Sequence, residues 1–189
     1  MGTGRIEAFS DGVIAVIITI MVLDLRVPTD PRISALLQDA PIFCSYALSF
    51  IMVAILWVNH HHLMHTARRA NGPLLWANNN LLFWMSLIPF VTAYMGRNHK
   101  EPFAVAMYGA VLAITAASFT LLRRVVVCHD TEDPAMTAHH NRMHRKNILS
   151  VITYTAAVGL AFVSVYLSFL IFVLVPALYF IPERKLAEH

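Results

Sequence analysis

The sequence predicts an all-α membrane protein with six transmembrane helices, and three observations support this fold class. Of its 189 residues, 58% are hydrophobic and only 13% are charged, which is too apolar for a soluble domain of this length. Apolar segments of about twenty residues recur along the chain, and about twenty helical residues cross a hydrocarbon core. Basic residues gather in short clusters between these segments, as topology determinants do. We therefore expect one membrane domain over residues 1–189.

The apolar segments define the expected helices in chain order. Four of them each have the length of one crossing, and we expect helices at about 5–26, 41–64, 73–95 and 102–127. A further run has no charged residue between Asn147 and Pro182. About 34 helical residues would extend some 50 Å, too long for one crossing, so we divide this run into helices at 147–162 and 164–181. The stretch 128–146 is expected to be a polar linker.

The basic residues indicate the orientation of these six spans. With a cytoplasmic N-terminus, the inner side holds ten of them: Arg5, Arg68, Arg69, Arg123, Arg124, Arg142, Arg145, Lys146, Arg184 and Lys185. The outer side holds Arg26, Arg32, Arg97 and Lys100. Because basic residues favour the cytoplasmic side, both termini are expected there. Because the basic residues lie in short clusters between apolar segments, their distribution also argues against nucleic acid as a partner.

The start of the first helix carries polar side chains that its apolar remainder does not explain. Arg5, Ser10 and Asp11 precede a segment in which Thr19 is the only polar residue up to Leu23. Polar groups in a membrane helix are expensive, and they usually face protein or water and have a partner. We expect Asp11 to bond to Arg5, to Ser10 or to a histidine of the second helix.

One face of this helix has a regular pattern. Its residues recur at i, i+3, i+4 and i+7 and are Val16, Thr19, Ile20 and Leu23. Periodicity alone is typical of a face that packs against other helices. The polar residues at the start of the helix favour a functional role instead.

Several motifs in the first half resemble the transmembrane protein 175 family of potassium channels, found in lysosomes and bacteria. Arg5, Phe9, Ser10 and Asp11 form the family pattern Arg-x-x-x-Phe-Ser-Asp. Further matches are Trp57-Val-Asn59-His60-His61, Asn80-Leu-Leu-Phe and Leu87-Ile-Pro89-Phe90. The second half matches only in hydropathy and length.

This resemblance implies a potassium-preferring cation channel in a prokaryotic plasma membrane. Its central pore would be lined by helix 1 of each subunit in a homotetramer, with Val16 at the narrowest ring and further rings at Ile20 and Leu23. An apolar constriction can close by dewetting, and conduction would be passive. Potassium would be the permeant ion among monovalent cations, the lipid bilayer the surrounding partner, and no cofactor is implied.

Two roles within this channel stay open at the level of sequence. The hydroxyl of Thr19 either contacts the ion or bonds back to the carbonyl of residue 15 or 16. Arg5, Phe9, Ser10 and Asp11 are expected to form a latch that ties helix 1 to its neighbours. Their expected partners are Trp57, Asn59, His60 and His61. Alternatively, Asp11 attracts cations as a ring at the inner mouth.

The histidines of the second helix suggest a different class of function. His61 and His65 are spaced i, i+4, which can place two imidazoles on one metal ion. A metal-ion or proton transporter using His60, His61 and His65 is therefore the alternative, whereas interfacial histidines that reach toward water are the simpler explanation. The sequence has no nucleophile with its base, no phosphate-binding glycine loop and no carboxylate dyad. We therefore predict that the protein is not an enzyme.

Overall fold

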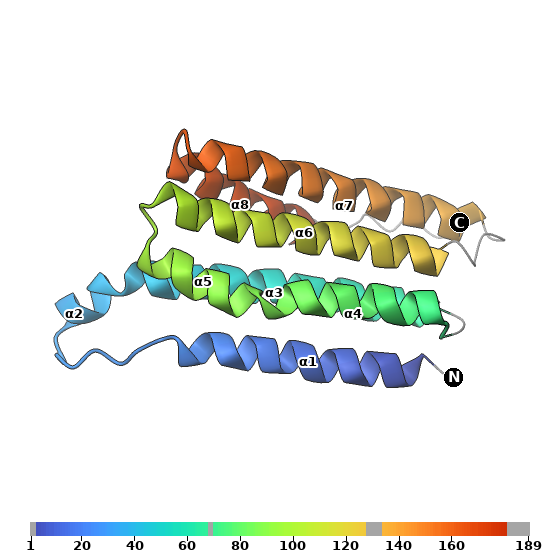
Figure 1. The fold of residues 1–189 in the computed structure, drawn as a ribbon, viewed down its shortest axis with the longest axis horizontal. Coiled ribbons are helices and arrows are strands. Elements are labelled where there is room, and N and C mark those ends of the chain that lie inside the picture. The colour runs from blue at the N-terminus through green and yellow to red at the C-terminus, as the bar shows by residue number, and fades with distance from the viewer. Residues whose placement is uncertain (1–2, 68–69, 128–133, 181–189) are drawn as a thin grey trace, which may run out of the picture.

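The computed structural model describes residues 3–67, 70–127 and 134–180, and this part of the chain is helical apart from short connections. Figure 1 shows the long helices lying side by side along one direction. The helices are α1 (Gly4–Leu23), α2 (Ile33–Gln38), α3 (Ala40–Thr66), α4 (Gly72–Ser86), α5 (Ile88–Arg97), α6 (Pro102–Val127), α7 (Pro134–Ala161) and α8 (Val165–Phe180).

Four segments of the described chain are long and apolar enough to cross a membrane. They are α1, α3, the continuous stretch of α4 and α5 over Gly72–Arg97, and α6. In α8 a shorter apolar stretch, Val165–Ala177, follows the turn at 162–164 that ends α7. The structure is therefore that of an all-helical membrane protein.

The helix expected at 73–95 is two helices in the structure. It is interrupted at Leu87, between the end of α4 and the start of α5. Pro89 explains the break, because proline has no backbone N–H and its ring clashes with the carbonyl of the residue four positions earlier, here Met85. The chain keeps its direction across the break, so both helices serve one crossing.

The first helix is shorter than expected, ending at Leu23 rather than near residue 26. Pro28 disfavours helical conformation in the residue before it, and helices commonly end ahead of such a residue. The connection that follows contains α2, a six-residue helix that the sequence analysis did not predict.

The stretch 128–146 is not a linker throughout. Residues 128–133 lie outside the described part of the chain, but α7 begins at Pro134 and includes the remaining polar residues. Proline suits the first turn of a helix, and the alanine, methionine, arginine and lysine residues that follow are good helix formers. With 28 residues, α7 is about 42 Å long. The change from polar to apolar residues near Asn147 therefore indicates where the apolar segment begins, and not where the helix begins.

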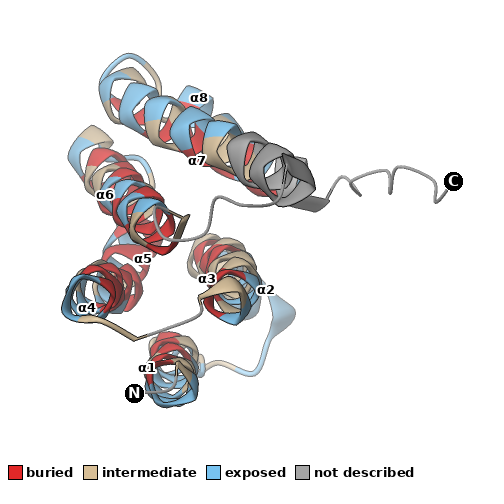
Figure 2. Ribbon diagram, turned by 90° about the vertical axis from the view of Figure 1, so that its right-hand side faces the viewer, coloured by how far each residue is buried: buried red, intermediate tan, exposed pale blue. Residues whose placement is uncertain are grey.

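The helices form a bundle in which α1 lies at one edge. It packs against α3, α4 and α5, while α6 packs against α4 on one side and α7 on the other. Figure 2, seen along the helices, shows α1 and the α7–α8 pair at opposite ends of this arrangement. Consequently α1 has neighbours in the chain on one side only.

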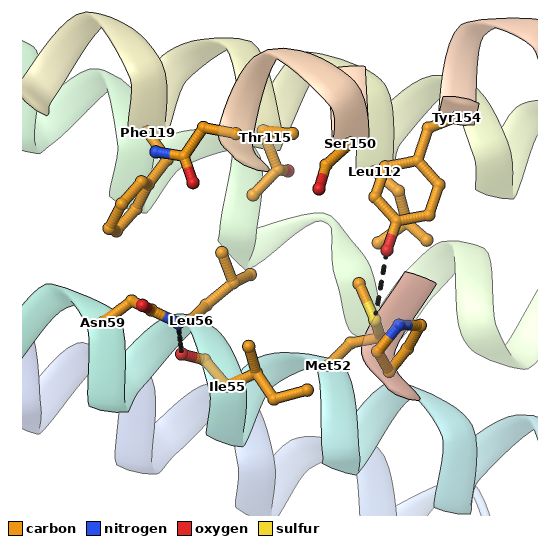
Figure 3. Close-up of a pocket in the computed structure, with 12 residues that line it drawn as sticks. Met52, Ile55, Leu56, Asn59, Leu112, Thr115, Phe119, Ser150 and Tyr154 are labelled. Carbon is orange, nitrogen blue, oxygen red and sulfur yellow. Dashed lines mark hydrogen bonds between the residues drawn. The ribbon is translucent and has the colours of Figure 1, made fainter. Parts of the chain in front are cut away.

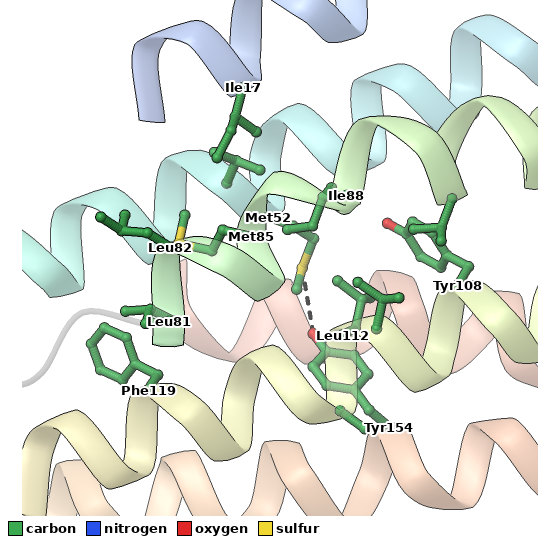
Figure 4. Close-up of a cluster of buried hydrophobic side chains, with 14 of the residues drawn as sticks. Ile17, Met52, Leu81, Leu82, Met85, Ile88, Tyr108, Leu112, Phe119 and Tyr154 are labelled. Atoms are coloured by element: carbon green, nitrogen blue, oxygen red, sulfur yellow. Dashed lines mark hydrogen bonds between the residues drawn. The ribbon is translucent and has the colours of Figure 1, made fainter. Parts of the chain in front are cut away.

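The core joins these layers through apolar side chains with a small number of internal polar contacts. Ile17 of α1 packs into a buried cluster with Met85 and Ile88 from the third crossing (Figure 4). Within the same bundle the hydroxyls of Ser49 and Tyr108 lie 2.9 Å apart, which connects α3 to α6. Buried hydroxyls are costly without such partners, so this pair also fixes the relative position of the two helices.

Close packing of α3 against α5 generates the first prediction. A Cβ atom on Gly96 would lie 3.1 Å from the Cα of Ile42, a backbone atom that cannot swing aside. We expect Gly96→Val to destabilise the protein by about 1–3 kcal/mol through overpacking. The measurement is the apparent melting temperature of the purified protein in detergent.

Gly159→Ala is the matched control, because a Cβ on Gly159 meets nothing within 4 Å. Alanine also has the higher helix propensity, so the melting temperature should stay the same or rise. A Gly96→Val protein as stable as the wild type would contradict the close contact.

Candidate functional site

One side of α1 is buried in the bundle and the opposite side is exposed. The buried side repeats at about one helical turn and consists of Ile6, Ser10, Ile14, Ile17 and Met21. On the exposed side the exposed fractions are 59% for Phe9, 54% for Val16, 45% for Ile20 and 80% for Leu23. Figure 2 shows the buried side toward α3 and α4. The chain therefore leaves one apolar face of α1 uncovered.

This face borders an open groove of about 710 Å³. From α1 it is lined by Phe9, Gly12, Val16 and Ile20, among others, and Phe90 of α5 contributes to the other wall. A contiguous apolar surface of this kind is covered by lipid, by another helix or by another chain.

Thr19 lies on the exposed side, and its hydroxyl is engaged. Its Oγ1 donates a hydrogen bond of 2.9 Å to the carbonyl oxygen of Val16, one of the two roles considered from the sequence. The bond uses the hydroxyl hydrogen but leaves the oxygen lone pairs as acceptors. Back-bonding and contact with a cation are therefore compatible at this residue.

The N-terminal half of α1 is held by a buried hydrogen-bond network. Ser10 is fully buried, and its hydroxyl donates to the carbonyl of Ile6 at 2.8 Å. The side-chain amide of Asn78 donates to Ser10 Oγ at 3.0 Å, and its Oδ1 lies 2.8 Å from His60 Nε2. Because Oδ1 is only an acceptor, Nε2 of His60 carries the proton. One polar cluster thus connects α1, α3 and α4.

A second set of contacts lies closer to the surface of α1 and α3. Trp57 Nε1 donates a hydrogen bond of 2.8 Å to Asp11 Oδ1. One turn away, His61 Nδ1 lies 2.8 Å from Glu7 Oε1, and the rings of Trp57 and His61 are stacked. His65 Nε2 is 3.6 Å from the same Glu7 oxygen. Of the expected partners, Trp57 and His61 therefore contact the start of α1 directly, whereas His60 is connected to it only through Asn78.

Two of the predicted latch residues and one expected partner do not take part in these contacts. Arg5 is exposed and has no ion pair or side-chain hydrogen bond within the described chain, and Phe9 faces outward. Arg5 and Asp11 are six positions apart, about 120° around the helix when viewed along it, so they cannot pair. Asn59 donates to the carbonyl of Ile55 at 2.8 Å and does not reach α1.

Asn59 instead borders a small internal cavity of about 40 Å³, shown in Figure 3. Thr115 of α6 and Ser150 of α7 line the same cavity, with apolar side chains around them. The walls of the cavity are mainly apolar, with a small number of polar side chains among them. It lies on the side of α3 away from α1 and contributes nothing to the latch.

Asn78 and Glu7 are central contacts that the sequence analysis did not single out. The run Asn78-Asn79-Asn80 was the available signal for the first, since amides in an apolar span need partners inside the protein. The C-terminal end of α1 also has a contact that the sequence analysis did not predict, because Arg97 of α5 lies 3.2 Å from Asp24.

The alternative function, a metal-ion or proton transporter using His60, His61 and His65, required these histidines to act together, and the structure separates them. His60 is buried and bonded to Asn78, so it does not share a site with His61 and His65. The structure places Glu7 with His61 and His65 instead, and their donor atoms lie within 4.8 Å of one another. The three histidines expected to act together are thus divided between two clusters.

Comparisons with known proteins match this chain to one family of ion channels. A family model described as "Endosomal/lysosomal potassium channel TMEM175" matches residues 5–89. A protein of Chryseobacterium sp. (strain P1-3) named as a potassium channel is 40% identical over all of this chain and 97% of its own length. A relative from Bos taurus, named as an endosomal/lysosomal proton channel, is 32% identical over 52% of this chain and 23% of its own length.

A solved structure agrees in fold over nearly the whole chain. It is the crystal structure of a lysosomal potassium-selective channel TMEM175 homolog from Chamaesiphon minutus, with a TM-score of 0.84 and 27% sequence identity. The match covers 94% of this chain and 95% of the other. These relatives are ion channels and not enzymes. The chain therefore belongs to the TMEM175 potassium channel family.

Proposed function

We propose that this chain is a passive, potassium-preferring cation channel whose pore is formed by α1 of four identical subunits. The observation that carries the proposal is the uncovered apolar face of α1 with Val16, Ile20 and Leu23. Lipid alone would also cover such a face. The assignment to a pore therefore also rests on the family, in which a bacterial relative of nearly the same length is named a potassium channel.

The proposed pore is an apolar constriction with one polar ring. Val16 to Leu23 spans about 10 Å along α1. Four copies facing an axis would form rings of valine, isoleucine and leucine, and such rings gate by dewetting after small changes in radius. Thr19 adds oxygen acceptors between the rings, because its hydroxyl hydrogen is already bonded to Val16. No cofactor enters this scheme, and potassium is the permeant ion.

The contacts at the ends of α1 support a role in setting the angle of the pore helix. Ser10 and Asp11 bond within the chain, to Asn78 and Trp57, and they lie off the apolar face. We therefore assign them to the latch rather than to an ion-attracting ring. Arg97 and Asp24 would hold the outer end.

The proposed topology has six crossings with both termini in the cytoplasm of a prokaryotic cell and the chain in its plasma membrane. Four candidate spans, the apolar stretch of α8 and the length of α7 support this count. Several of the basic residues that set the orientation, Arg68, Arg69, Arg184 and Lys185 among them, lie outside the described residues.

The direct test is ion flux through purified protein in liposomes. Potassium should leave loaded liposomes down its gradient without an imposed proton gradient, and the protein should have about four times the 21.2 kDa mass of one chain. Proton flux is measured with a pH-sensitive dye in the same vesicles, because a eukaryotic relative is named a proton channel. Strict dependence on a proton gradient, or transport of zinc or manganese instead, would favour the transporter alternative.

Substitutions on the exposed face test the pore. Val16→Thr, Ile20→Thr and Leu23→Thr each replace an apolar side chain by a polar one, and a wetter constriction should raise potassium flux or reduce selectivity over sodium. The control is Val22→Thr, because Val22 is also exposed at 44% but lies about 120° away around the helix. Equal flux in all four variants and the wild type would show that α1 does not line the path.

Removing one donor tests the latch. Trp57→Phe keeps an aromatic ring but deletes the N–H that binds Asp11, and we expect a stability loss of about 1 kcal/mol together with altered flux. Trp76→Phe is the matched control, because Trp76 is 77% exposed on α4. The latch assignment fails if the two variants have the same melting temperature and the same flux.

A further inference from the structure

Three side chains of types that can ligate metal ions gather near the N-terminal end of α1. They are Glu7 of α1 and His61 and His65 of α3, and one donor atom of each lies within 4.8 Å of the others. The rings of His61 and His65 are in edge contact with centroids 4.4 Å apart. We propose that these residues form a binding site for a divalent transition-metal ion such as Zn²⁺, joining α1 to α3.

The spacing of residues on both helices produces this cluster. Glu7 and Asp11 are one turn apart on α1, and so are His61 and Trp57 on α3. Because the helices run in opposite directions, Asp11 meets Trp57 and Glu7 meets His61, which gives two contacts of 2.8 Å one turn apart. The next turn of α3 brings His65 to the same carboxylate. The tryptophan contact holds the register that keeps the three ligands together.

The chemistry of this set selects the class of ion. Two imidazole nitrogens with one carboxylate oxygen are typical ligands of zinc, and a tetrahedral site with three protein ligands keeps its fourth position for water. Magnesium and calcium prefer oxygen ligands throughout. Potassium, the proposed permeant ion, is likewise not the cation that two imidazoles favour.

The geometry needs only side-chain adjustment to hold an ion. Ligand atoms at about 2.0–2.1 Å from a tetrahedral ion lie about 3.4 Å from one another. Donor atoms that are now up to 4.8 Å apart must therefore approach by about 1.4 Å at most, and the His61 and Glu7 atoms at 2.8 Å must separate slightly. The side chain of His65 is 62% exposed and that of His61 40% exposed, so both rings have room to turn. The proton that His61 shares with Glu7 must leave when the nitrogen binds metal.

The neighbouring histidines are excluded by their surroundings. His60 is buried and committed to Asn78. His62 is exposed, but it is not one of the residues whose donor atoms converge. This site concerns only the contact between α1 and α3, so it is independent of whether α1 lines a pore.

The experiment is a Zn²⁺ titration of the purified full-length chain by calorimetry, with any affinity tag removed. Wild type should bind one ion per chain at this site, and saturating Zn²⁺ should raise its melting temperature. His65→Ala and Glu7→Gln should lose that ion or weaken its binding at least tenfold. His62→Ala, which removes a histidine from the same turn, should bind as wild type does.

A second control and a second readout keep the result unambiguous. His144→Ala removes one of the three histidines of α7, and it should leave the melting-temperature shift intact. Co²⁺ in place of Zn²⁺ should give the visible spectrum of a tetrahedral site in wild type but not in His65→Ala. The proposal is overturned if His65→Ala, with normal size and helix content, binds zinc as tightly as wild type. None of these readouts depends on potassium flux.

Discussion

A hydrogen-bonding group inside a bilayer must find its partner within the protein, and this constraint organises the region around α1. Ser10 is satisfied by Ile6 and Asn78, and Asp11 by Trp57. All of these partners lie on α1 itself or on α3 and α4. Ser10 and Asp11 are thereby bonded within the bundle, and the face with Val16, Ile20 and Leu23 is left exposed.

Two kinds of contact hold α1 in the bundle, apolar burial and polar bonds, and they affect its position differently. Ile14, Ile17 and Met21 are buried against the bundle by contacts that have no preferred direction, so they favour burial without defining a register. The bonds of Asp11 to Trp57 and of Asp24 to Arg97 are directional and lie near opposite ends of the helix. The rotation and tilt of α1, which decide where its exposed face points, therefore depend mainly on a small number of polar residues near its ends.

Much of this arrangement could be predicted from the sequence, and the exceptions have physical causes. Apolar length predicted the membrane character, but it could not separate a membrane segment from the polar helical extension of α7. The helical phase explains the error at Asn59, which lies about 200° around α3 from Trp57, whereas His61 lies about 40° from it. Asn78 and Glu7 could not be assigned from their own helices, because a hydrogen-bond partner is set by the tertiary neighbour rather than by local spacing.

The same reasoning explains why one chain is an incomplete unit in the proposed channel. A helix packed on one side cannot enclose a path, and an open groove lies beside the exposed face of α1. Lipid tails are as apolar as leucine, so association of helices gains little from hydrophobicity alone in a membrane. In the proposed channel, the free energy of association must then come from close packing of the copies around an axis. Such packing is possible only if each α1 presents the same face. In the proposed channel, the internal polar contacts that orient α1 are thus needed both for assembly of the subunits and for the pore.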